Sequence, residues 1–194
     1  MKARTDTPYI DQRMFRSGMI LHARTNGFFG RAIRLCSGSW GNHDALLVYE
    51  AGGWWVCDAE PPVAHLTAWD EWERRLRGGK CKLRFYWPAG AMSMDGRVAA
   101  KWWLRNVRNA PYDKLAFPRL LWRAVVGRWW KSQAGQDHAW WCTEATRAAW
   151  KFAGFDPWGR NNSTPLDTEE AVGPGRLDDW TGEIMPADSP SSAP

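Results

Sequence analysis

The sequence predicts an α+β fold of one domain, in which a small antiparallel sheet packs against helices. Its 194 residues suffice for one domain with a hydrophobic core, and a second full domain would be cramped. Segments with the alternation typical of strands are interleaved with segments at helical spacing. A hairpin pattern over residues 43–59 predicts two paired strands.

The first expected elements precede this hairpin. Residues 1–15 are polar and predict a loose N-terminal arm. Residues 19–23 predict a short strand, and the apolar positions of residues 27–36 predict a short helix. Gly38 and Gly41 end that helix, because glycine favours turns over helix interiors.

The hairpin itself is bounded by turn residues. Residues 43–49 and 54–59 are the expected strands, and the Ala-Gly-Gly sequence at 51–53 is the expected turn. Pro61 and Pro62 end the second strand because proline cannot donate a backbone hydrogen bond. The later elements are expected in this order: a helix over 64–76, a strand over 81–87, an amphipathic helix over 93–109 that stops before Pro111, and helical stretches near 114–130 and 139–153.

Charge is unevenly distributed along the chain. Residues 66–131 hold fifteen Lys and Arg against five Asp and Glu, for a net charge of +10, whereas residues 132–194 have a net charge of −6. A basic middle third suits phosphate, anionic lipid or acidic cell-wall polymers, although a solvated surface is the commoner explanation. Nothing besides this positive charge indicates nucleic-acid binding, so no specific nucleic-acid partner is predicted.

The four cysteines show no CxxC or paired spacing, and no signal peptide precedes them, so we expect reduced thiols. The histidines other than His43 lack ligand spacing with any cysteine, so neither a metal site nor a cofactor is expected. No apolar run approaches the ~18 residues of a membrane span. Without a signal peptide, the expected location is the cytoplasm.

Two segments about a hundred residues apart carry the candidate chemistry. His43 opens the first hairpin strand, and Cys142 lies in the first turn of an expected helix. A thiol at a helix N-terminus faces the positive end of the peptide dipole, which favours the nucleophilic thiolate. Imidazole is the side chain best suited to exchange a proton near neutral pH. The pair therefore predicts a thiol nucleophile and its base.

The length of the hairpin loop decides whether an acid reaches the histidine. An even loop pairs Tyr49 with Trp54 and places Asp58 and Glu60 on the face of His43. An odd loop presents Cys57 there instead, with no carboxylate to orient the imidazole ring. Only the even register makes a triad.

Several motifs, taken in order, give a specific resemblance. They are Ser17-Gly18-Met19-Ile20-Leu21, similar to a "GDI" strand; His43, at an "SH" strand; Asp58-Ala59-Glu60-Pro61-Pro62-Val63, similar to "EA-x-x-P-V"; Ala110-Pro111-Tyr112-Asp113, similar to "KPYD"; and Trp141-Cys142-Thr143-Glu144, similar to "YCSE". The chain thus resembles the permuted papain-like amidases, the circularly permuted branch of the NlpC/P60 superfamily represented by YiiX-like proteins. The resemblance implies a circularly permuted papain-like fold with a catalytic domain over residues 16–155. The Pro-, Gly- and Asp-rich composition of residues 156–194 predicts a mostly irregular tail.

The resemblance also implies roles for individual residues. Cys142 would be the nucleophile of a Cys-His-Asp triad, His43 the base, and Asp58 the orienting acid, with Glu60 as the alternative acid. Asp58 is favoured because its spacing is collinear with the family motif, although it is shorter than the usual Glu. The other departures are Asn42, Ala45 and Thr143, where the family has Ser, Gly and Ser. Tyr112 and Gln136 are candidates for the substrate cleft and the oxyanion site.

The implied function is a cysteine hydrolase or acyltransferase that acts on an amide or ester, either a cell-wall peptide or a lipid amide. Small size and a Trp-rich basic face fit a bacteriophage virion-associated peptidoglycan endopeptidase. The alternative is a non-catalytic structural or interaction module of a virion or envelope assembly, whose signature would be an occluded Cys142. Trp122, Trp129 and Trp130, which lie among basic residues, are candidates for contact with a partner protein or an anionic envelope.

Overall fold

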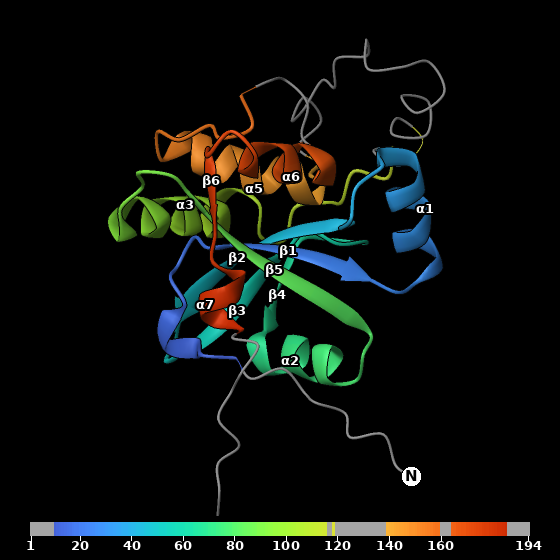
Figure 1. Cartoon of the computed structure of the whole chain (residues 1–194), viewed down its shortest axis with the longest axis horizontal. Helices are drawn as coiled ribbons and strands as arrows, with labels where there is room; N and C mark the ends of the chain where they lie inside the picture. Colours follow the sequence, from blue (N-terminus) through green and yellow to red (C-terminus); the bar gives the residue numbers. More distant parts are fainter. Residues whose placement is uncertain (1–9, 116–117, 119–138, 160–163, 186–194) are drawn as a thin grey trace, which may run out of the picture.

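The computed structural model describes residues 10–115, 118, 139–159 and 164–185 (Figure 1). Gln136, Trp122, Trp129 and Trp130 lie outside the described residues, as does most of the helix expected near 114–130.

The described residues form a mixed α+β fold around a six-stranded antiparallel sheet with the strand order β4-β3-β2-β1-β5-β6. The strands are β1 (Ile20–Thr25), β2 (His43–Glu50), β3 (Gly53–Asp58), β4 (His65–Ala68), β5 (Cys81–Pro88) and β6 (Leu177–Asp179). The helices are α1 (Phe28–Ser37), α2 (Trp69–Arg77), α3 (Ser93–Asn106), α5 (Cys142–Phe152), α6 (Pro165–Val172) and α7 (Thr181–Ile184), preceded by the short 3-10 helix η1 (Gln12–Met14).

Helices cover both faces of the sheet. Figure 1 shows α3, α5 and α6 on one side and α2 on the other, with α1 at one end. Tryptophan supplies much of the core: Trp72, Trp103 and Trp150 have no exposed surface. Buried indoles need a partner for their N–H group, and Trp150 donates its own to the Gly18 carbonyl oxygen at 2.9 Å. This contact ties α5 to the segment that leads into β1.

The β2–β3 hairpin has the even register. Tyr49 pairs with Trp54, and Glu50 pairs with Gly53. Ala51 and Gly52 form the two-residue turn with φ values of 50° and 83°, and two positive φ values are what a type I′ hairpin turn requires. Even-numbered β3 residues therefore share a face with His43.

The helix expected over residues 64–76 is wrong in its first part. Residues His65–Ala68 form β4, which pairs with β3, and the helix begins only at Trp69. Asp70 and Glu71 then occupy the first turn of α2, where carboxylates interact favourably with the helix dipole. Edge pairing to β3 outweighs local helical spacing in this segment.

The segment after residue 155 contains more regular structure than its composition indicates. α6 begins with a capping box, in which Thr164 and Asp167 exchange hydrogen bonds, and with Pro165 in the first turn. β6 then pairs with β5, and Leu177 and Ile184 are buried. The expected irregular tail thus contributes an edge strand and two helices to the fold.

The N-terminal segment also packs more closely than a loose arm. Ile10 and Phe15 are 8% and 6% exposed and flank the short helix η1. Phe15 contacts Trp69 edge to face, with ring centroids 4.7 Å apart. Ile10 and Phe15 therefore belong to the core, while Gln12 and Arg13 between them are exposed.

No helix within the described ranges combines the length and apolar character needed to cross a bilayer.

Candidate functional site

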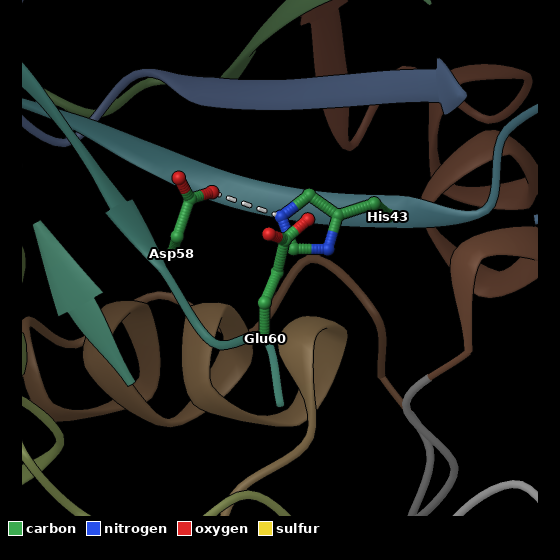
Figure 2. Close-up of side chains that lie close together, drawn as sticks. All are labelled: His43, Asp58 and Glu60. Atoms are coloured by element: carbon green, nitrogen blue, oxygen red, sulfur yellow. Dashed lines mark hydrogen bonds and ion pairs between the residues drawn. The ribbon is translucent and has the colours of Figure 1, made fainter. Parts of the chain in front are cut away.

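His43 and Asp58 meet where β2 begins and β3 ends. His43 is the first residue of β2 and Asp58 the last of β3, so the even register brings their side chains to the same face. The His43 Nε2 atom lies 3.0 Å from Asp58 Oδ1 (Figure 2). Their exposed fractions are 5% and 0%. A buried carboxylate in this position fixes both the orientation and the tautomer of the imidazole.

Asp58 is held in turn by α2. Its second oxygen, Oδ2, accepts a hydrogen bond from Trp72 Nε1 at 2.9 Å. The Trp72 ring also lies nearly parallel to the His43 ring, with centroids 6.0 Å apart and an interplanar angle of 10°. Trp72 therefore positions both members of the His43–Asp58 pair.

Cys142 is the first residue of α5, directly after the N-cap residue Trp141. No side chain caps this N-terminus, so the first-turn N–H groups and the positive end of the helix dipole face the thiol. Cys142 is 3% exposed. The thiol lies close enough to His43 to raise the pKa of its imidazole.

Burial on its own lowers the pKa of His43, but its hydrogen bond to Asp58 and its interactions with the Cys142 thiol and Glu60 raise that pKa well above its usual value. Figure 2 shows Nε2 of His43 facing Asp58, so Nδ1 is the ring nitrogen left for the thiol. These surroundings favour the protonated form of the imidazole.

Glu60 and Tyr112 also belong to the surroundings of His43 and Cys142. Figure 2 shows the Glu60 carboxylate against the face of the His43 ring, and one potential ligand atom each from His43, Asp58 and Glu60 lie within 4.8 Å of one another. Burial raises the pKa of Tyr112, and negative charge at Cys142 and Glu60 raises it further. The Tyr112 backbone N–H binds the Pro62 carbonyl oxygen at 3.1 Å, which fixes the tyrosine beside the Glu60 segment.

The structure contains a second buried cluster of charged and polar side chains that the sequence did not predict. His22 on β1 pairs across the sheet with Asp44 on β2, and His22 Nδ1 lies 2.6 Å from Asp44 Oδ1. Its Nε2 lies 3.0 Å from Glu169 Oε1 on α6. Had the strands expected at residues 19–23 and 43–49 been paired with each other, His22 and Asp44 could have been predicted as neighbours. No local sequence pattern indicates the contact with Glu169.

This cluster reaches the residue next to the thiol. Asp44 Oδ2 accepts hydrogen bonds from Thr143 Oγ1 at 2.6 Å and from Thr168 Oγ1 at 2.9 Å. Thr143 follows Cys142 at the start of α5, and Thr168 lies on α6. Asp44 therefore fastens the N-terminus of α5 and the middle of α6 to β2, directly behind His43.

The cluster predicts a loss of stability at alkaline pH. Burial alone lowers the pKa of His22, but Asp44 and Glu169 raise it from 6.5 to about 9. Because the pKa of His22 is higher in the folded state than in the unfolded state, its protonation stabilises the fold. This stabilisation is complete below pH 6.5 and disappears as the pH rises through about 9. We expect the free energy of unfolding to fall by about 3 kcal/mol from His22 between these limits.

Urea unfolding at pH 7 and pH 9.5 measures this difference. Glu169→Gln removes one of the two carboxylates beside His22 and should reduce the pH-dependent loss, whereas Glu183→Gln on the exposed surface of α7 should leave it unchanged. Equal losses in the two variants would show that His22 does not cause the effect.

No protein-family model matches the chain. No curated protein matches it either. A crystal structure described as metalloprotein yiiX from Escherichia coli O157:H7 has a TM-score of 0.53 and 17% sequence identity, and the match covers 93% of this chain and 94% of that chain. The chain therefore has a YiiX-like fold.

Proposed function

We propose that this protein is a thiol-dependent amidase or acyltransferase in which Cys142 is the nucleophile, His43 the general base and acid, and Asp58 the residue that orients His43. The observation that carries this proposal is the 3.0 Å contact between His43 and Asp58 beside a thiol at the N-terminus of α5. The motif order along the chain and the YiiX-like fold agree with it.

The reaction would proceed in two half-reactions. The Cys142 thiolate attacks the substrate carbonyl carbon, and the carbon–nitrogen bond breaks as His43 Nδ1 gives its proton to the leaving amine. The acyl group is then a thioester on Cys142. His43 next takes a proton from water or another hydroxyl acceptor, whose oxygen attacks the thioester carbonyl. The carbon–sulfur bond then breaks, which releases the acyl group and restores the Cys142 thiolate beside protonated His43. Asp58 holds the Nε2–H throughout, so Nδ1 remains the working nitrogen.

Charge on the substrate oxygen needs hydrogen-bond donors. The backbone N–H groups in the first turn of α5 lie at the end of the helix that carries the thiol and suit this role. The raised pKa of Tyr112 keeps its phenol protonated, so the O–H group is a donor at neutral pH. Gln136 remains a candidate on sequence grounds alone.

Family resemblance and charge distribution support the choice of substrate. A cell-wall peptide or a lipid amide would be acceptable to a thiol nucleophile, and the basic middle of the chain suits an anionic target. We propose a peptidoglycan endopeptidase carried by a bacteriophage virion as the specific biological form. Candidate contacts with assembly partners remain Trp122, Trp129 and Trp130.

Intact-mass spectrometry after exposure to an iodoacetamide-type probe tests the reactive thiol. One adduct should form rapidly on Cys142, because burial raises the pKa of both Cys57 and Cys81 and makes those thiols unreactive. His43→Gln should slow labelling of Cys142 by at least about 10-fold, since it removes the imidazole that favours the thiolate. Labelling of Cys142 no faster than that of Cys36, which is half-buried, would contradict the proposal.

One observation favours the non-catalytic alternative. Cys142 is only 3% exposed, which is the occlusion expected of a structural module that retains the fold. The same mass spectra separate the two functions. A non-catalytic module would leave Cys142 unlabelled in the folded protein and would label it only after denaturation.

Metal binding is the other alternative, because the structure with the same fold is described as a metalloprotein. His43, Asp58 and Glu60 supply the right kinds of ligand atoms. However, Asp58 uses one oxygen for His43 and the other for Trp72, and His43 uses Nε2 for Asp58. A metal bound by all three would break these contacts, so the residues as arranged do not fit a metal centre.

A further inference from the structure

α1 presents apolar side chains to solvent. Phe28 and Leu35 are 85% and 87% exposed. They are seven residues apart, so they lie on the same face of the helix. Gly30 and Ile33 are buried on the opposite face, against the rest of the protein. An outward apolar stripe is the reverse of the usual pattern for a surface helix and indicates an interaction surface.

Positive charge surrounds this stripe. Arg31 lies on α1 beside Phe28 and Leu35, and Arg24 lies near the end of β1, just before the helix. α1 itself contains no acidic residue. Burial lowers the pKa of Arg34, and repulsion from Arg24 and Arg31 lowers it further, which places the three guanidinium groups close together. No ion pair joins any of the three to a carboxylate of the described residues.

We propose that α1 is a peripheral docking surface for an anionic lipid bilayer. Phe28 and Leu35 enter the boundary between headgroups and acyl chains, and Arg24 and Arg31 contact the headgroup phosphates. Apolar burial together with attraction to anionic headgroups is how interfacial helices bind membranes.

The positive charge around α1 favours an anionic bilayer over a second copy of the chain as its binding partner. A symmetric dimer through α1 would place the same face of both copies together and oppose their arginines. Like charges facing each other across an apolar contact are unfavourable. An anionic bilayer instead satisfies the apolar and the cationic residues at once.

The docking surface is connected to the candidate site. Arg34 donates hydrogen bonds to the Thr25 carbonyl oxygen at 2.6 Å and to Asn42 Oδ1 at 3.0 Å. Asn42 immediately precedes His43, and its Oδ1 also accepts the Thr25 backbone N–H at 2.8 Å. A membrane bound at α1 would therefore lie at the end of the sheet where β2 and His43 begin. This inference does not depend on the proposed reaction.

Sedimentation with lipid vesicles tests the surface. The full chain should bind vesicles containing phosphatidylglycerol and should bind vesicles of phosphatidylcholine alone at least about 10-fold more weakly. The double variants Phe28→Ser/Leu35→Ser and Arg24→Gln/Arg31→Gln should each weaken binding to the anionic vesicles by about 10-fold or more. Their melting temperatures should stay close to that of the parent, because the replaced side chains lie at the surface or its margin.

A matched control replaces exposed apolar residues elsewhere. Met92 and Met94, at the start of α3, are 68% and 61% exposed, and Met92→Ser/Met94→Ser should leave vesicle binding unchanged. An equal loss in this control, or failure of the parent to bind anionic vesicles, would overturn the proposal. So would a dimer in solution that Phe28→Ser/Leu35→Ser converts to a monomer without any vesicle binding. Should the double variant unfold, Phe28→Ser alone provides the comparison. Labelling of Cys142 in the same variants reports separately on the proposed reaction.

Discussion

Cys142→Ala is expected to abolish turnover of an acyl ester or amide substrate while leaving the protein folded. Both half-reactions of the proposed mechanism pass through the sulfur atom, so no residual route through a thioester remains. The substitution removes only the sulfur atom at the start of α5, and the Thr143–Asp44 hydrogen bond still holds that end of the helix. Initial rates with a chromogenic p-nitrophenyl ester measure the effect, and circular dichroism confirms folding.

Cys57→Ala is the matched control. Cys57 is buried next to Asp58, but it lies on the opposite face of β3 from His43, and burial raises the pKa of its thiol. Activity per folded molecule should change little in this variant. Comparable losses in the two variants would show that activity depends on packing around the site and not on a nucleophile at Cys142.

Asp58→Asn should lower kcat/KM by about 10²–10⁴, because the amide favours the wrong tautomer of His43. Trp72 Nε1 donates to Oδ2 of Asp58, so an asparagine would keep its oxygen there and turn its NH₂ group toward His43 Nε2. Nε2 would then have to accept a hydrogen bond, which moves the ring proton to Nδ1. The nitrogen facing the thiol would no longer act as a base.

Glu60→Gln separates the two candidate acids. Glu60 lies against the face of the His43 ring (Figure 2), whereas Asp58 accepts from the ring edge. We therefore expect Glu60→Gln to reduce kcat/KM far less than Asp58→Asn and to act mainly by shifting the pH profile of the His43–Cys142 pair. The reverse ranking of the two variants would assign the orienting role to Glu60. Melting temperatures of both variants exclude a simple loss of folded protein.

The hairpin shows where sequence reasoning succeeds. The sequence predicts both strands of the hairpin and leaves an even and an odd loop open. The structure has the even loop, with a two-residue turn at Ala51 and Gly52, and the alternation of side chains then places Asp58 on the same face as His43. All of this information lies within sixteen consecutive residues. The α+β class, the helix at Cys142 and the strand at residues 81–87 were predictable for the same reason, since each depends on a local pattern.

The two edge strands of the sheet could not be predicted from local sequence patterns. Residues 65–68 have helical spacing with the residues that follow, yet they form β4, because β3 offers unpaired backbone groups beside them. Residues 177–179 are too few to predict a strand, and they form β6 only because β5 is available as a partner. Hydrogen bonds to a distant strand decided both outcomes.

The sequence by itself determined the α+β class and the hairpin, and it limited the neighbours of His43 on that hairpin to Asp58 and Glu60 or to Cys57, because these depend on neighbours along the chain. The even register itself is an observation of the structure. Only the tertiary structure decided that Trp72 holds Asp58 and that His22 joins Asp44 to Glu169. It also decided that the apolar side of α1 faces outward. Spacing within a helix or strand defines which residues share a face, but the direction of that face depends on elements that pack against it from elsewhere in the chain.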